Sequence, residues 1–245
     1  CILGWGNIGS AIARGLKKSG QFATGDITLT RRKIQHLDEF KKAGFQITAN
    51  NSDAVNKSDI VIIAVGPSQL EPLLKDVSSD FNKNHLIISI VSGVKIQEIQ
   101  KMVGTEIPII RAMPNTAADL GESMTCLSVD TGFEKDLETA KSLFNQIGKI
   151  LVISEEQMAS ATALGACGIA FFLRAIRAAS QGGIEIGFHS DEAYTIAAQT
   201  ARGAATLLLD NDVHPEEEID RVTTPLGATI AGLNEMEHQG FSSAM

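Results

Sequence analysis

The chain opens on a glycine pattern that restricts its fold more than any other feature. Gly4, Gly6 and Gly9 fit the spacing G-x-G-x-x-G, directly after a short apolar run and directly before an apolar-periodic helix. In such a unit the first glycine permits a tight turn, the second lets the backbone approach a pyrophosphate, and the third allows close helix–strand packing. The helix N-terminus then faces the phosphates. We therefore assign five residues to a dinucleotide: Gly4, Gly6, Asn7, Ile8 and Gly9. The alternative is a glycine turn in an α/β fold that binds no nucleotide.

The remaining pattern predicts two domains. Short β-branched runs alternate with helix-like segments over the first half, which favours a Rossmann-type, mostly parallel sheet covered on both faces. The expected strands are Ile27–Arg31, Ile60–Val65, Leu86–Ile90 and Ile107–Arg111, extended by Thr125–Val129 and Lys149–Ser154. After Ser154 the spacing becomes helical. We expect an α/β protein with a dinucleotide-binding Rossmann domain at residues 1–153 and an all-helical substrate and dimerisation domain at residues 154–245.

The end of the second predicted strand indicates the cofactor. It reads Thr30-Arg31-Arg32, without the carboxylate that holds the ribose hydroxyls of NAD. An arginine there can pair with a 2′-phosphate instead, so NADPH is expected and NADH is the alternative. Further segments that fit the rim of the cofactor site are Asn51, Ala64-Val65-Gly66-Pro67 and Met113-Pro114-Asn115.

Composition narrows the partners and the location. Residues 151–245 hold four Lys and Arg against 13 Asp and Glu, which disfavours nucleic acid as a partner. The longest apolar run, Ala161–Leu173, is shorter than a membrane span and favours a buried or interface helix, hence a homo-oligomer and no membrane partner. Three cysteines without metal-ligand spacing predict reduced thiols in a cytoplasmic protein that has no metal site: Cys1, Cys126 and Cys167.

Four segments, in order and at matching intervals, carry a resemblance that covers essentially the whole chain. They are Gly4-Trp-Gly6-Asn-Ile-Gly9, Ala64-Val-Gly-Pro67, Arg111-Ala-Met-Pro-Asn-Thr116 and Val222-Thr-Thr-Pro-Leu-Gly-Ala-Thr-Ile-Ala-Gly-Leu233. Together they resemble the pyrroline-5-carboxylate reductase family. The resemblance implies an interlocked dimer, sometimes assembled into a decamer, and NADPH-dependent hydride transfer to the C=N carbon of 1-pyrroline-5-carboxylate, which gives proline.

The resemblance also implies where the substrate binds. It places the cyclic imino acid at Glu155 and at the loop that holds Thr224, Gly227, Ala228 and Thr229. The residues agree, because Pro225 and Gly227 predict a turn directly before a helix, whose free first-turn N–H groups suit a carboxylate. Thr229 is the expected catalytic residue, donating a hydrogen bond to the imine nitrogen. Ordinary helix capping by Thr224 is the alternative.

Several positions depart from the family pattern. The family usually has lysine where Gly66 stands, a glycine at Leu226, and Ser-Gly-Ser-Gly-Pro-Ala-Tyr along the long helix, where this chain has Gly165-Ala-Cys167-Gly-Ile169-Ala-Phe171. These departures leave open a reductase of another cyclic imino acid, such as a six-membered ring, and a non-catalytic NADP-binding paralogue. A β-hydroxyacid dehydrogenase is disfavoured, because those enzymes use a lysine from the helical domain and none occurs after Lys149.

Overall fold

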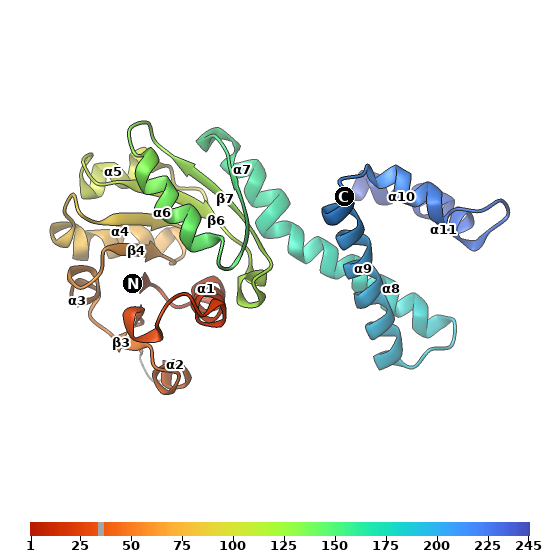
Figure 1. Cartoon of the computed structure of the whole chain (residues 1–245), viewed down its shortest axis with the longest axis horizontal. Helices are drawn as coiled ribbons and strands as arrows, with labels where there is room; N and C mark the ends of the chain where they lie inside the picture. The colour runs from red at the N-terminus through yellow and green to blue at the C-terminus, as the bar shows by residue number, and fades with distance from the viewer. Residues whose placement is uncertain (34–36) are drawn as a thin grey trace. The chain divides into compact units, whose positions relative to one another are not determined.

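The computed structural model describes residues 1–33 and 37–245 (Figure 1). It contains two compact units, Cys1–Gly168 and Ile169–Met245. The first unit is built on one mostly parallel sheet and the second is helical, which confirms the predicted fold class. The division between the units lies after Gly168 because residues 155–168 pack with the sheet, whereas the sequence pattern changes near residue 154.

Eight strands form the sheet in the order β3-β2-β1-β4-β5-β6-β7-β8. All neighbours are parallel except β6 and β7, which are antiparallel. The strands are β1 (Ile2–Leu3), β2 (Thr28–Thr30), β3 (Gln46–Thr48), β4 (Ile60–Ile63), β5 (Leu86–Ser89), β6 (Ile109–Met113), β7 (Ser123–Val129) and β8 (Gly148–Val152). The strand order reverses at β1 and β4, and in open α/β sheets ligands bind at such a point, beyond the carboxyl ends of the strands.

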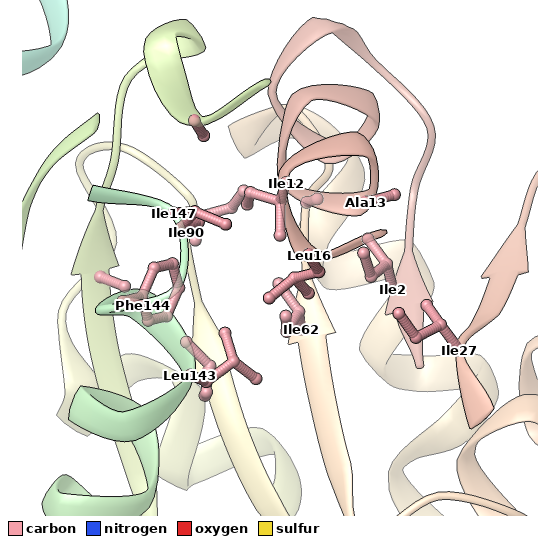
Figure 2. Packing of buried hydrophobic residues seen from close by; sticks show 14 of the residues in the cluster. Ile2, Ile12, Ala13, Leu16, Ile27, Ile62, Ile90, Leu143, Phe144 and Ile147 are labelled. Carbon is pink, nitrogen blue, oxygen red and sulfur yellow. The ribbon is translucent and has the colours of Figure 1, made fainter. Parts of the chain in front are cut away.

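Helices cover both faces of the sheet because successive strand residues point to opposite sides. Ile2 and Ile62 belong to one apolar cluster, together with α1 (Asn7–Ser19) and α6 (Glu134–Phe144). Figure 2 shows this cluster, where side chains of β1, α1 and the end of α6 converge. The next residue in each strand joins a second cluster with three further helices: α3 (Asn51–Asn56), α4 (Pro67–Val77) and α5 (Ile96–Val103).

Two details of the sheet differ from the sequence prediction. β6 begins at Ile109 rather than at residue 107, because Pro108 has no N–H to donate to a ladder. The edge strand β3 was not predicted, since only one of its three residues, Ile47, is apolar. Other short elements among the described residues of this unit are η1 (Thr24–Asp26), α2 (Asp38–Lys42), η3 (Ser78–Asp80), η4 (Thr116–Leu120) and η5 (Glu155–Gln157).

A continuous helical stretch, Glu155–Glu185, changes its winding along its length. After η5 it contains α7 (Met158–Ala161), a π-helical segment (Thr162–Cys167) and α8 (Gly168–Glu185). By length and composition alone this stretch could cross a membrane, and only 6% of its most apolar window is buried. The helices that follow are α9 (Ser190–Asn211), α10 (Pro215–Val222), α11 (Ala228–His238) and α12 (Phe241–Ala244).

The helical unit carries large apolar side chains on its surface. Phe171, Phe172 and Leu173 on α8 and Tyr194 and Leu209 on α9 are all exposed. Large apolar side chains exposed in such number on the surface of a soluble protein indicate a contact with another molecule.

Candidate functional site

A cleft of about 470 Å³ lies beyond the carboxyl ends of β1, β2 and β4. Nine of the predicted cofactor residues line it: Gly4, Gly6, Thr30, Arg31, Arg32, Asn51, Ala64, Val65 and Gly66. The topological position, at the reversal of strand order, is that of a dinucleotide site.

The three glycines of the opening turn have different surroundings. Gly4 has φ +97°, and a Cβ atom there would lie 2.5 Å from Val65 Cγ1, so a side chain is excluded by both conformation and space. At Gly9 a Cβ atom would lie 2.8 Å from the Gly4 carbonyl oxygen, where α1 packs against β1. At Gly6, among the described residues other than its two chain neighbours, no atom lies within 4 Å of such a Cβ. The space over Gly6 is therefore open to a ligand, and the turn fits a pyrophosphate.

The end of β2 supplies the positive charge of the cleft. Arg31, Arg32 and Lys33 all line it, and Arg32 and Lys33 are exposed. Thr30 has a different role, because it is buried and its Oγ1 accepts a hydrogen bond from the Gly4 N–H at 3.4 Å. Thr30 thus holds the glycine turn to β2, while the three cations face the space in which a 2′-phosphate would be bound.

Seven further residues that the sequence analysis did not predict line the cleft: Trp5, Lys33, Ala49, Gln69, Pro72, Leu73 and Asp76. Four of them lie on α4 at the helical spacing i, i+3, i+4 and i+7, which places them on one face. Gln69 caps that helix, since its Oε1 accepts from the Gly66 N–H at 3.2 Å. The helical spacing of these residues within the segment 67–77 indicates this face in the sequence, whereas the motifs at strand ends do not.

Trp5 lies in the glycine turn, between Gly4 and Gly6, and its indole ring packs against a neighbouring aromatic ring. Its ring packs edge-on against Phe40, with ring centroids 4.3 Å apart, and the Arg14 guanidinium lies 5.0 Å from the centroid of the Phe40 ring. Trp5 is also the one tryptophan of the chain. Its fluorescence therefore reports on this cleft alone.

The other predicted cofactor residues lie outside the lining of the cleft. Asn7, Ile8 and Gly9 form the first turn of α1, and Pro67 is the first residue of α4. Met113 is buried against Cys126 and Met158, and burial raises the pKa of the Cys126 thiol. Contacts of these residues with a cofactor stay predictions, and so do those of Pro114 and Asn115 in the turn after β6.

Glu155 is engaged by two neighbours from the sheet domain. Its Oε1 accepts from the Ile96 N–H at 2.7 Å and from Arg111 Nη1 at 3.2 Å. The Arg111 side chain is 7% exposed and that of Glu155 is 23% exposed. One carboxylate thus joins the first residue of α5, the middle of β6 and the start of the long helix. Its predicted contact with substrate remains a prediction.

The predicted substrate loop forms a tight turn in the helical unit. The Thr224 carbonyl accepts from the Gly227 N–H at 3.0 Å, with Pro225 and Leu226 between them. Leu226 has φ +61° and a fully exposed side chain. The third position of a turn with proline second usually requires glycine for this conformation, so Leu226 is strained. Gly227 then caps α11, and the N–H groups of Ala228 and Thr229 are free of intrahelical partners.

The sheet order and the glycine turn define a dinucleotide-binding protein of the Rossmann class. Two family models match the chain. The model "NADP oxidoreductase coenzyme F420-dependent" matches residues 1–93, and "Pyrroline-5-carboxylate reductase dimerisation" matches residues 155–245.

Relatives extend this match over the full chain. The chain is 53% identical over 256 residues to pyrroline-5-carboxylate reductase 1 of Dictyostelium discoideum, covering all of this chain and 46% of that protein. It is 50% identical over 262 residues to pyrroline-5-carboxylate reductase 2 of the same organism, covering all of this chain and 87% of that protein. The solved pyrroline carboxylate reductase of Plasmodium falciparum, with NADP bound, has TM-score 0.90 and 25% identity, over 99% of this chain and 90% of that chain. The chain belongs to the pyrroline-5-carboxylate reductase family.

Proposed function

We propose that this chain reduces 1-pyrroline-5-carboxylate to proline with NADPH as the hydride donor, in proline biosynthesis. The observation that carries the proposal is the likeness along the whole chain to two reductases of that name, one of which the chain covers to 87% of its length. The proposed cofactor is supported by the solved relative that binds NADP and by the three cations at the end of β2. NADH is the weaker alternative, because no carboxylate follows Thr30 directly.

The proposed site residues have two roles: they position NADPH and the imino acid, and they polarise the C=N bond. When bound, NADPH supplies a hydride at the nicotinamide C4. Arg31 and Arg32 would pair with its 2′-phosphate, and the open backbone at Gly6 would hold its pyrophosphate. Thr229 donates a hydrogen bond to the ring nitrogen, and the free N–H groups at the start of α11 bind the carboxylate. The protonated C=N carbon is already electrophilic, so accurate placement is the main catalytic contribution.

The helical unit is proposed to join two copies of the chain. Its family model is that of a dimerisation domain, and the exposed apolar side chains of α8 and α9 need such a cover. This partner also accounts for the membrane-like composition of Glu155–Glu185 without a bilayer. The cytoplasm is the proposed location. Light scattering on a sizing column measures the molar mass of the assembly, and a monomer at micromolar concentration would contradict the proposed homo-oligomer.

NADPH oxidation with 1-pyrroline-5-carboxylate, followed by absorbance, tests the proposed reaction, with NADH as the comparison. Quenching of Trp5 fluorescence measures NADPH binding separately. Turnover with NADPH supports the proposal. Binding without turnover of this substrate contradicts it, and the six-membered imino acid is then assayed, since one methylene changes discrimination by only ~1–3 kcal/mol. The strained Leu226 in the substrate loop is the observation that favours this second candidate. Binding without turnover of either ring indicates a non-catalytic paralogue.

A further inference from the structure

The π-helical segment, Thr162–Cys167, interrupts the long helix where it contacts β6 and β7. π-helical turns are rare, and they are frequently found at functional sites. Within such a turn the acceptor offset is five residues rather than four, so the backbone ladder is irregular where the turn joins the α-helix, and a side chain from outside the helix can hold it there.

Asn115 supplies a donor to this segment. Its Nδ2 donates to the Gly165 carbonyl oxygen at 3.0 Å. The opposite atom of the same amide, Oδ1, accepts from the Ala117 N–H at 3.1 Å and caps η4. The backbone N–H of Asn115 donates to Ser123 Oγ at 3.0 Å. Three bonds fix the residue, so its side chain has one orientation and both ends of its amide are engaged within the protein.

The position of Asn115 links two parts of the first unit. It follows β6, at the edge of the sheet where the Met113–Asn115 turn lies. Gly165 lies 50 residues later, on the long helix, within the residues that the dimerisation model matches. This chain has Ile169 four residues after Gly165, and the Gly165 carbonyl, which has two lone pairs, accepts the bond from Asn115 Nδ2 across the 50-residue separation.

We propose that Asn115 is a positioning residue: its hydrogen bond to the Gly165 carbonyl holds the π turn and fixes the long helix to the Met113–Asn115 turn in the geometry that the reaction needs. The proposal rests on the proposed function for its effect on turnover. Its structural part, the restraint of the π turn, does not depend on any activity. Asn115 therefore acts through Gly165 and its own turn, because both ends of its side-chain amide are engaged within the protein.

The Asn115→Asp variant tests this role. At neutral pH the introduced carboxylate still accepts from the Ala117 N–H, but it has no N–H to donate to Gly165. Amide hydrogen exchange of the segment 162–168 is expected to be about five to ten times faster, as loss of one hydrogen bond implies. The kcat with 1-pyrroline-5-carboxylate is expected to fall about tenfold or more. The Kd of NADPH, read from Trp5 fluorescence, is expected to stay within about twofold.

Asn82→Asp is the matched control. Asn82 Oδ1 accepts from the Asn84 N–H at 3.0 Å, the same i to i+2 contact, in an exposed loop before β5. This variant is expected to leave exchange and kcat unchanged. If Asn115→Asp does not fold, Asn115→Ser replaces it, because serine keeps a capping oxygen and is too short to reach Gly165.

Two results would overturn the proposal. Unchanged exchange of the segment 162–168 shows that Asn115 does not hold the π turn. A large rise in the Kd of NADPH with unchanged exchange assigns Asn115 to the cofactor. If the wild-type protein turns over no cyclic imine, the proposed function fails, and the exchange measurement still decides the role of Asn115.

Discussion

Replacing Glu155 with alanine is the change whose effect the structure determines most closely. The carboxylate joins Arg111 on β6 and the Ile96 N–H at the start of α5. Alanine removes both contacts and leaves the Arg111 guanidinium, 7% exposed, without this acceptor. Removing one partner of a fully buried ion pair typically costs ~3–5 kcal/mol.

The expected loss of stability follows from these contacts. Because Glu155 is 23% exposed, water reaches the pair, and we take ~2 kcal/mol for the ion pair. The lost acceptor at the N-terminus of α5 adds ~1 kcal/mol. A total of ~3 kcal/mol corresponds to a fall in Tm of roughly 6–12 °C for a chain of this size.

Thermal unfolding followed by circular dichroism measures this change. Glu156→Ala is the matched control, because Glu156 is the neighbouring, exposed glutamate, and its loss is expected to change stability by less than about 0.5 kcal/mol. A shift in Tm for Glu155→Ala no larger than that of the control would show that these two contacts do not stabilise the fold. A raised KM for the imino acid with an unchanged Tm would assign Glu155 to the substrate instead.

Four further substitutions test the cofactor cleft and the substrate loop. Gly6→Ala is expected to raise the Kd of NADPH at nearly unchanged Tm. Gly9→Ala is expected to destabilise the fold by ~2 kcal/mol, because a Cβ at Gly9 meets protein atoms and one at Gly6 does not. Equal Tm values for the two variants would contradict this difference. Arg32→Ala is expected to raise the KM of NADPH about tenfold or more and to leave that of NADH nearly unchanged, which steady-state kinetics with both cofactors checks. Leu226→Gly is expected to gain about 0.5 kcal/mol, since relief of the positive φ exceeds the added entropy of the unfolded chain, and a loss in thermal unfolding would contradict it.

Local patterns were sufficient to predict the sheet and most of the cofactor cleft. The opening glycines and the apolar strands specify a parallel sheet, and parallel strands bring their carboxyl ends to one edge. The basic residues after Thr30 therefore meet the Gly4 turn without any knowledge of tertiary contacts. β3 was missed, because an edge strand of three residues carries too weak a pattern.

Contacts between distant segments could not be predicted in this way. The bond between Glu155 and Ile96 joins residues 59 apart, and that between Asn115 and Gly165 joins residues 50 apart. Neither pair has a spacing signal, since each depends on how the long helix packs on the sheet. The strain at Leu226 could not be predicted from the sequence either, because a positive φ at a non-glycine residue contradicts local conformational preference.

Transfer of a labelled hydride is the most direct test that the chain reduces 1-pyrroline-5-carboxylate with NADPH. The enzyme is incubated with 1-pyrroline-5-carboxylate and NADPH that carries deuterium at the transferred position of nicotinamide C4, and the product is examined by mass spectrometry and NMR. We expect proline with one deuterium on the δ carbon, in a one-to-one ratio with NADPH oxidised. Oxidation of NADPH without labelled proline, or no oxidation by protein that binds NADPH, would contradict it.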